Sequence, residues 1–441
     1  MLQTLFYIPP QFFGVPVFGF GWLLGILAAG TAVMLLVPQL RRRTSAASTL
    51  FTAGIIAALL FFVFPNLIEP PYGIPIRGYG ACLLLAIFAA LTLVIHLAKQ
   101  RNIAAESAYS LCLWAVVCGI AGARLFYVTE YWQELIYFDA DGHLLIPETL
   151  WSVLNIAGGG LVVFGSIIGG IIGCTIFIRR NALPFFAVFD ALAPALMLGI
   201  AVGRIGCFLN GCCFGGVCEE PWAVTFPAGS PAHIHQIEHG KVFYDGLKFQ
   251  ETDGTLSIAE VLAGSPAADA GMQPGMLIRS ITAATKETGE ITPVSFAPAS
   301  AAALTLLLQH LHQLSPNDKV RFDIYTNAQR TAAQPYYVPM SAPQILPVHP
   351  TQLYSSAAAF AVCGILLALN RLPFYRCRSG LVFASFLIIY AVVRFGIEII
   401  RTDEDSFLGT GLTVSQNISI LFAAAGIVLF VYLITKSRTS V

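Results

Sequence analysis

The chain has 441 residues, of which 56% are hydrophobic and 11% are charged, and its mean hydropathy is +0.74. Soluble domains carry roughly 25% charged residues, so this composition excludes an ordinary soluble domain and indicates a polytopic membrane protein. The formal net charge is zero and no basic block resembles a nucleic-acid footprint, which argues against a nucleic-acid partner.

Nine apolar windows follow one another along the chain, each of about 20 residues and long enough to cross a bilayer as a helix. They are 17–38, 48–66, 79–98, 108–128, 156–178, 184–206, 350–370, 380–400 and 416–435. The first 30 residues carry no basic segment ahead of their apolar run. We therefore expect the first helix to be retained rather than removed as a signal peptide.

The loops between these windows predict the orientation. Basic clusters follow the first, third, fifth, seventh and ninth windows, among them Arg41–Arg43 and Arg179–Arg180, and all of them fall on one side of the membrane. By the positive-inside rule the N-terminus is extracytoplasmic and the C-terminus cytoplasmic. The polar segment 207–349 then faces the extracytoplasmic compartment.

The polar segment has the composition of a small soluble domain. Residues 256–281 alternate like a strand, turn at Gly264-Ser265-Pro266 into a short helix, and turn again into a second strand. Residues 300–314 have a helical pattern, and 320–326 would form a closing strand. The run closely resembles a PDZ domain of the bacterial protease type. Such domains bind extended peptides by strand addition, so the insert is expected either to capture a peptide or to act as a structural lid or spacer.

Charged residues inside apolar segments are the strongest functional signal. Arg204 lies at the end of an apolar window, and such a residue costs about 2.5–3.5 kcal/mol at the centre of a spanning helix unless it has a partner or a task. Tyr390, Arg394 and Glu398 share one face of another helix, with Arg401 at its outer end. Arg394 and Glu398 either satisfy each other or form, with Arg204, a phosphate site near the outer membrane face. A phospholipid is the phosphate ester most available there.

The segment from Gly203 to Gly215, Gly-Arg-Ile-Gly-Cys-Phe-Leu-Asn-Gly-Cys-Cys-Phe-Gly, resembles the signature of the prolipoprotein diacylglyceryl transferases. That signature runs Gly-Arg, Gly-Asn-Phe, Asn-Gly-Glu and a closing Gly. Further segments match in the family's order, namely 74–80, 122–128, 158–160 with 164–165, 349–354 and 390–401. The resemblance covers nearly everything outside residues 1–70 and the PDZ-like insert.

The resemblance implies a seven-helix core between residues 79 and 435. We expect two extra N-terminal helices in 1–70, the first part of the core in 71–249, the PDZ-like insert in 250–340 and the second part of the core in 341–441. The predicted fold class is therefore an all-α polytopic membrane protein with about nine transmembrane helices and a small α+β extracytoplasmic insert. The predicted location is the bacterial inner membrane.

The family's reaction moves the diacylglyceryl group of phosphatidylglycerol to the lipobox cysteine thiol of a preprolipoprotein and releases glycerol phosphate. The resemblance implies that two arginines clamp the departing phosphate, that polar residues orient the headgroup, and that His349 or Glu398 takes the thiol proton. It implies no cofactor and no metal. The catalytic candidates are Arg204, Arg394, Glu398 and His349, and the substrate-binding candidates are Arg204, Asn210, Tyr79, Tyr390, Gly203 and Arg401.

Three positions depart from the family pattern. Cys207 and Cys212 stand where the family has asparagine and glutamate, and Phe164 stands where its His-Gly-Gly turn has histidine. Two alternatives follow: a non-catalytic relative that binds phospholipid and a peptide, or a transferase with a different acceptor. The cysteines at 207, 212, 213 and 218 favour a disulfide over a metal site, because adjacent cysteines rarely ligate one ion well; buried free thiols are the remaining possibility.

Overall fold

The computed structural model forms two compact units. The residues that it describes are 4–17, 20–36, 49–50, 53–54, 56–57, 60–61, 68, 72–137, 144–155, 160, 162–252, 255–287, 290–296, 319–326, 332–339, 344–401 and 411–436. One unit comprises residues 1–83 and 205–352, and we call it the insert unit. The other comprises residues 84–204 and 353–441, and we call it the helical unit.

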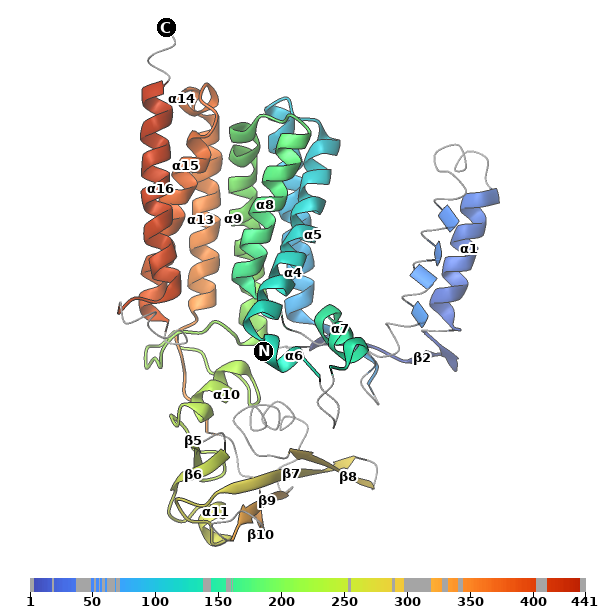
Figure 1. Ribbon diagram of the computed structural model, residues 1–441, viewed down its shortest axis with the longest axis vertical. Coiled ribbons are helices and arrows are strands. Elements are labelled where there is room, and N and C mark those ends of the chain that lie inside the picture. Colours follow the sequence, from blue (N-terminus) through green and yellow to red (C-terminus); the bar gives the residue numbers. More distant parts are fainter. Residues whose placement is uncertain are drawn as a thin grey trace. The chain divides into compact units, whose positions relative to one another are not determined.

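Long apolar helices make up the helical unit (Figure 1). Six helices in the described part of the chain are long and apolar enough to cross a membrane. They are α4 (Gly78–Gln100), α5 (Ala105–Glu130), α9 (Phe185–Asn210), α13 (Thr351–Arg371), α15 (Leu381–Ile400) and α16 (Val414–Lys436). The remaining helices of this unit are α6 (Trp132–Leu135), α7 (Ile146–Leu154), α8 (Val163–Arg180) and α14 (Pro373–Arg376).

These six helices correspond to six of the nine predicted windows. The window 17–38 contains the shorter apolar helix α1 (Trp22–Leu36), which has 15 residues. The window 156–178 overlaps α8, which has 18 residues and begins only at Val163. Most of the window 48–66 lies outside the described residues. The described chain therefore supports a polytopic helical membrane protein, and the count of nine spanning helices stays a prediction.

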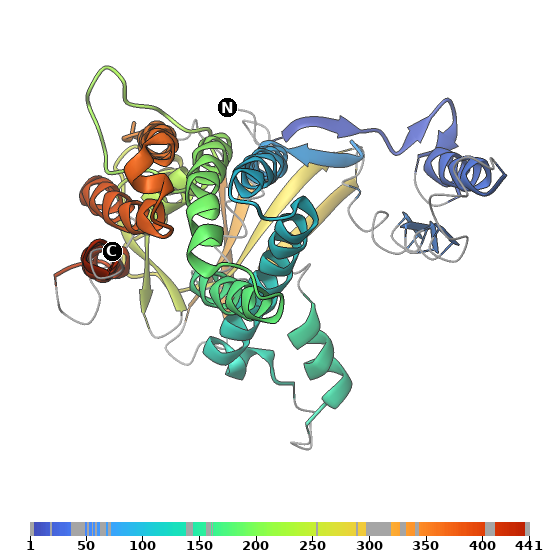
Figure 2. The ribbon, with the colours of Figure 1, turned by 90° about the horizontal axis from the view of Figure 1, so that it is seen from above.

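Helix α9 takes part in both hydrophobic cores of the helical unit and lies between α4 and α13 in two perpendicular views (Figures 1 and 2). On one side Val188 packs in a core with residues of α4, α5 and α8, including the buried Leu111. On the other side Met197 packs in a core with α13 and α15, including the fully buried Leu366. Because α9 ends in the signature segment, this packing fixes the approach of that segment.

Glycines bring α5 and α8 into close contact. Gly165 and Gly169 are four residues apart on α8, and a Cβ atom at Gly169 would lie well inside van der Waals contact of the Cys118 carbonyl oxygen on α5. Gly122 of α5 faces the Gly165 carbonyl oxygen in the same way. Such small-residue spacing lets the backbones of membrane helices approach each other.

A buried ion pair fixes one end of the helical unit. Asp190 of α9 is fully buried and pairs with Arg101, with 2.9 Å between Oδ2 and Nη1. The Asp190 carboxylate also accepts hydrogen bonds from the backbone N–H groups of Gly380 and Phe383, at 2.7 and 2.8 Å. A carboxylate from α9 therefore caps the N-terminus of α15, where backbone N–H groups have no partner inside their own helix.

The insert unit contains small antiparallel sheets. Strand β5 (Leu247–Thr252) pairs with β6 (Thr255–Val261), and a four-stranded sheet has the order β10-β9-β7-β8. Its strands are β7 (Ile278–Glu287), β8 (Glu290–Phe296), β9 (Lys319–Tyr325) and β10 (Ala333–Pro339). Helices α10 (Pro231–Glu238) and α11 (Pro266–Asp269) lie in the same part of the chain, and the unit also contains α1. Near the N-terminus β1 (Thr4–Ile8) pairs with β4 (Ile74–Arg77), and β2 (Gln11–Phe12) pairs with β3 (Val15–Pro16).

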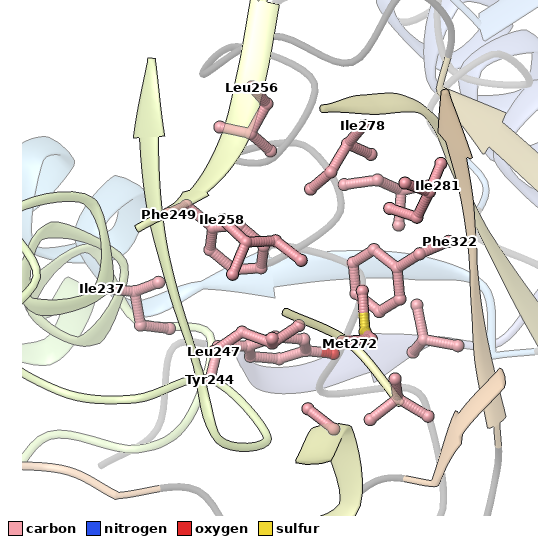
Figure 3. Close-up of a cluster of buried hydrophobic side chains, with 14 of the residues drawn as sticks. Ile237, Tyr244, Leu247, Phe249, Leu256, Ile258, Met272, Ile278, Ile281 and Phe322 are labelled. Atoms are coloured by element: carbon pink, nitrogen blue, oxygen red, sulfur yellow. The ribbon is translucent and has the colours of Figure 1, made fainter. Parts of the chain in front are cut away.

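One hydrophobic core joins α10 to these sheets. Figure 3 shows Ile237 of α10 among Leu247 of β5, Ile258 of β6, Ile278 of β7 and Phe322 of β9. Each of these side chains is at most 1% exposed. The insert unit therefore has a core of its own, as a small domain requires.

The predicted strands and turn of the insert are present. Ser265 caps α11 by accepting a hydrogen bond from the Ala268 N–H at 3.3 Å, as the Gly264-Ser265-Pro266 turn predicts. Strands β6, β7 and β9 lie where the sequence places them. The predicted helix over 300–314 lies outside the described residues. The described part establishes small antiparallel sheets with short helices, and the PDZ-like assignment stays a prediction.

Candidate active site

The charged residues of α15 form a buried cluster in the helical unit, which we call the arginine cluster: Arg204, Tyr390, Arg394, Glu398 and Arg401. The Glu398 side chain is fully buried, and its Oε2 lies 2.8 Å from Arg394 Nη2 and 3.7 Å from Arg401 Nη1. The i, i+4 spacing that the sequence predicted to be one helix face therefore produces an ion pair. The two arginine side chains are themselves only 14% and 8% exposed.

The N-terminus of α16 supplies two further partners that the sequence analysis did not identify. Ser415 Oγ accepts a hydrogen bond from Arg394 Nη2 at 2.8 Å. The Thr413 hydroxyl donates to Glu398 Oε1 at 3.3 Å. A serine and a threonine at a helix start are read from sequence as capping residues, so no local signal distinguishes this role. Together these contacts fix the Arg394 guanidinium from two helices.

Positive charge exceeds negative charge in the arginine cluster. Arg204 of α9 and Tyr390 of α15 both lie close enough to Arg394 to act on it electrostatically. The cluster thus contains three guanidinium groups and one carboxylate among the described residues. These groups lie among the helices of a membrane protein. Such an arrangement favours an anion, and guanidinium groups match phosphate geometry.

Helix α9 leaves an open face beside its arginine. A Cβ atom at Gly203 would meet no other atom within 4 Å, and the neighbouring Arg204 is half-buried. A ligand can therefore approach the α9 backbone at this position. This is the predicted substrate-binding glycine, and the space beside it is consistent with that prediction.

The insert unit holds the second half of the signature segment. Gly206 permits close contact between the end of α9 and the start of α4, because a Cβ atom there would lie 2.9 Å from Cys82 Cβ and 3.3 Å from the Tyr79 carbonyl oxygen. Tyr79 is 42% exposed. Asn210 ends α9, and its side chain hydrogen-bonds the Cys212 thiol. Two predicted substrate-binding residues, Tyr79 and Asn210, thus lie on segments that meet at Gly206.

A returning segment, residues 344–352, runs back along the signature segment. The Gly215 N–H donates to the His349 carbonyl oxygen at 2.9 Å, and the His349 N–H donates to the Gly216 carbonyl oxygen at 3.0 Å. Val348 is buried and bridges to both Val217 and Val224. The backbone of His349 is therefore fixed beside the signature segment although more than 130 residues separate them in sequence.

Three cysteines of the signature segment meet in the insert unit. The sulfur atoms of Cys207, Cys212 and Cys213 all lie within 4.8 Å of one another. All ten cysteines of the chain are free thiols, including Cys218, for which the sequence favoured a disulfide. Cys218 is buried, with 3% of its surface exposed.

Arg124 has a structural role that the motif alone did not indicate. Its guanidinium donates hydrogen bonds to the carbonyl oxygens of Ser152, Val153 and Gly160, and it lies over the Tyr127 ring at 5.1 Å from the centroid. The side chain is 8% exposed. Arg124 therefore joins the end of α7 to Gly160. In the first turn of α8, Phe164 is 37% exposed and stands in place of the histidine that the family resemblance implied.

The predicted site residues are divided between the two units. The helical unit contains Gly203, Arg204, Tyr390, Arg394, Glu398 and Arg401. Arg204, Tyr390 and Arg401 are each linked to Arg394 or Glu398 by the contacts above. The insert unit contains Tyr79, Asn210 and His349. The contacts above link the charged residues of the helical unit, and the assignment of these residues to a substrate site stays a prediction.

Comparisons with known proteins decide the family. The family model described as prolipoprotein diacylglyceryl transferase matches residues 65–432. A phosphatidylglycerol–prolipoprotein diacylglyceryl transferase of Rhodopirellula baltica is 32% identical over 458 residues, which cover 97% of this chain and 88% of that protein. The chain belongs to the prolipoprotein diacylglyceryl transferase family. It is a transferase of lipoprotein biosynthesis and a multi-pass membrane protein.

Other members of the prolipoprotein diacylglyceryl transferase family match a smaller part of the chain. The enzymes of Finegoldia magna and Thermosynechococcus vestitus are 32% and 36% identical over 154 residues, which is 35% of this chain. The matched segments cover 58% and 53% of those two enzymes. The match to the Rhodopirellula baltica protein, by contrast, extends over nearly the whole chain and is not confined to the membrane helices.

Proposed function

We propose that this chain moves the diacylglyceryl group of phosphatidylglycerol to the lipobox cysteine thiol of preprolipoproteins. Family membership supports the reaction, and the arginine cluster is the single structural observation that carries the mechanism. Arg394 and Arg401 share the fully buried Glu398, and Arg204 lies in electrostatic range of Arg394. Guanidinium groups gathered at one place suit a departing phosphate ester.

In the proposed reaction the substrate thiolate attacks the carbon of the diacylglyceryl group that is bonded to the phosphate oxygen. A carbon–sulfur bond forms, the carbon–oxygen bond to phosphate breaks, and glycerol phosphate leaves with the electron pair. Arg204 and Arg394 hold the phosphate oxygens as charge accumulates on them. Arg401 adds to the positive charge, and Tyr390 helps to position Arg394.

The thiol proton must pass to a base before or during the attack. Glu398 pairs with two arginines and accepts a hydrogen bond from Thr413, so we assign it to positioning of the guanidinium groups. His349 is our choice as proton acceptor, because the returning segment fixes its backbone beside the signature segment. Tyr79 and Asn210 are our candidates for contacts to the lipid headgroup.

The finer organisation of the chain is also part of the proposal. The basic loops support an extracytoplasmic N-terminus and insert and a cytoplasmic C-terminus in the bacterial plasma membrane. We propose nine spanning helices, with two in residues 1–70 and seven in the core segments 71–249 and 341–441. Residues 250–340 would form a PDZ-like domain that binds an extended part of the secreted substrate.

Complementation tests this function. The chain would be expressed in bacteria depleted of their own diacylglyceryl transferase, and lipid labelling of a reporter lipoprotein would be followed. We expect labelling with the wild type, its loss with Arg204→Ala and with Arg394→Ala, and full labelling with Arg376→Ala, which changes an exposed arginine of α14. A well-expressed, membrane-inserted wild type that gives no labelling would contradict the proposal and favour the binding protein or the different acceptor.

A further inference from the structure

The proposed transfer reaction assigns no step to the three clustered thiols at 207, 212 and 213. Cys207 lies in the last turn of α9, and Cys212 and Cys213 follow directly after the helix. Their sulfur atoms lie within 4.8 Å of one another, and all three residues are half-buried free thiols. Two of them replace polar residues of the family signature. Three soft sulfur donors at one point are the donor set that thiophilic metal ions prefer.

The backbone between these thiols is folded so that adjacent cysteines face the same point. Cys213 has a φ of 57°, a left-handed conformation that costs roughly 1–2 kcal/mol in a residue with a Cβ atom. Gly211 also has a positive φ, of 77°. This double reversal removes the obstacle that normally prevents neighbouring cysteines from ligating one ion. A strained turn persists only where other contacts maintain it.

Two fully buried side chains from the start of α13 maintain this turn. Thr351 Oγ1 donates a hydrogen bond to the Cys213 carbonyl oxygen at 2.7 Å, and Gln352 Nε2 donates to the Cys212 carbonyl oxygen at 2.7 Å. Both side chains belong to residues with no exposed surface. The positions of Cys212 and Cys213 are therefore fixed by a second segment, as in a preorganised site.

The spacing of the sulfur atoms fits a metal ion better than a disulfide. With metal–sulfur bonds of about 2.3 Å, trigonal or tetrahedral coordination separates the sulfur atoms by roughly 3.8–4.0 Å. A separation within 4.8 Å needs only a small contraction to reach that value. A disulfide would require two sulfur atoms at about 2.05 Å with a defined dihedral angle, and would leave the third thiol unused.

We propose that Cys207, Cys212 and Cys213 form a three-thiolate site for a soft metal cation of the Cu⁺ or Zn²⁺ class. Cu⁺ accepts three thiolates in a trigonal arrangement, whereas Zn²⁺ requires a fourth ligand, such as water, to complete a tetrahedron. Each thiol that becomes a ligand loses its proton to solvent, so binding releases protons and weakens as the pH falls. The site goes beyond the transferase function, since that reaction needs no metal.

Metal titration of the full-length protein tests this site. The reduced protein in detergent would be titrated with Cd²⁺, whose thiolate complexes absorb in the ultraviolet, and Zn²⁺ and Cu⁺ would then compete for the site. We expect saturation at one equivalent and a roughly tenfold or greater loss of affinity in Cys207→Ser, Cys212→Ser and Cys213→Ser. Cys218→Ser and Cys377→Ser are the matched controls, and we expect no change in either.

A second measurement does not depend on the folding of any variant. X-ray absorption of the wild type loaded with one equivalent of Zn²⁺ should show three sulfur neighbours at about 2.3 Å.

Thr351→Val, which retains every thiol but removes the hydrogen bond to Cys213, should weaken Cd²⁺ binding. The proposal is overturned by an absorption band that persists in the triple serine variant, by a zinc ion without sulfur neighbours, or by a disulfide among these cysteines in protein isolated from membranes without reductant. None of these readouts uses transferase activity.

Discussion

Glu398 is buried inside the helical unit with opposite charges and a hydroxyl group as its partners. Its two oxygens contact Arg394, Arg401 and the Thr413 hydroxyl. Breaking a buried pair by removing one partner costs about 3–5 kcal/mol, since the other charge stays buried without compensation. The carboxylate therefore fixes the positions of the guanidinium groups as well as the packing of α15 on α16.

Glu398→Gln keeps the shape of this side chain and removes its charge. We expect transferase activity to fall roughly 100-fold, because a displacement of about 1 Å in a catalytic group has an effect of that size. Activity would be measured as lipid transfer to a lipobox peptide in nanodiscs. Glu260→Gln, at an exposed pair with Lys248, is the control and should retain full activity. Equal activity of the two variants would show that Glu398 does not position the arginines.

His233 gives the insert unit a dependence on pH. It is 3% exposed, its backbone N–H is bound by the Ser230 cap of α10, and burial lowers the pKa of its imidazole below 6.5. The unfolded chain then binds more protons than the folded chain as the pH falls below about 6.5. The stabilisation from neutral His233 is therefore present above that pH and is lost on acidification.

Thermal unfolding between pH 8 and pH 5 would detect this dependence. The unfolding temperature of the wild type should fall below about pH 6.5. Because His233→Gln has no imidazole to titrate, its unfolding temperature should fall less over the same interval. His239→Gln removes an exposed histidine of the same region and should keep the wild-type dependence. Parallel curves for all three proteins would exclude His233 as the titrating group.

Local spacing made part of the residue chemistry predictable. Tyr390, Arg394 and Glu398 share a helix face at intervals that any helix imposes, so their association could be read from the sequence. The partners Ser415, from α16, and Asp190, which pairs with Arg101, could not be read in this way. Their contacts depend on which helices become neighbours, and the sequence pattern of a single helix does not predict its neighbours.

At the scale of elements, the packing of α5 on α8 depends on glycines. Gly169→Ala would place a methyl group against the Cys118 carbonyl oxygen, and relief requires the two helices to separate. We expect a loss of roughly 1–3 kcal/mol of stability, the usual cost of overpacking. Gly170→Ala is a matched control on the next residue, where the nearest atom would lie 3.8 Å away, and should change stability by less than about 0.5 kcal/mol.

The measurement is unfolding of the detergent-solubilised protein by heat or denaturant, with the two variants side by side. A lower midpoint for Gly169→Ala than for Gly170→Ala is expected. The same midpoint in both would mean that the α5–α8 contact is not tightly packed.

The elements themselves were predictable where hydrophobicity alone determines them. Six apolar windows correspond to six helices that can span a membrane, because length and composition suffice for that inference. The pairing of β7 with β9 in the insert was not predictable. In the order β10-β9-β7-β8, strands β7 and β9 pair although other segments separate them in sequence, and pairing of that kind depends on tertiary packing rather than on local pattern.

At the scale of the whole molecule, the insert unit has its own core and its own sheets. If it guides the secreted substrate, deletion of residues 250–335 should raise the apparent KM for a lipobox substrate and leave phospholipid binding unchanged. Steady-state kinetics and a lipid-binding assay on the same preparation would separate the two effects. Kinetics unchanged by the deletion would argue that the insert does not recruit substrate, and loss of lipid binding would point to a purely structural role.

Two backbone hydrogen bonds of 3.0 Å, one in each direction, join Val224 to Val348. These residues are the two ends of the segment that contains the insert. Its entry and exit are therefore adjacent, and the entropy of closing a chain between adjacent ends grows slowly, by about 0.6 kcal/mol for each doubling of its length. This segment can therefore be lengthened or shortened in evolution with little effect on the stability of the membrane helices. Diversity in size among relatives should accordingly concentrate between these two valines, while the membrane helices keep their number and order.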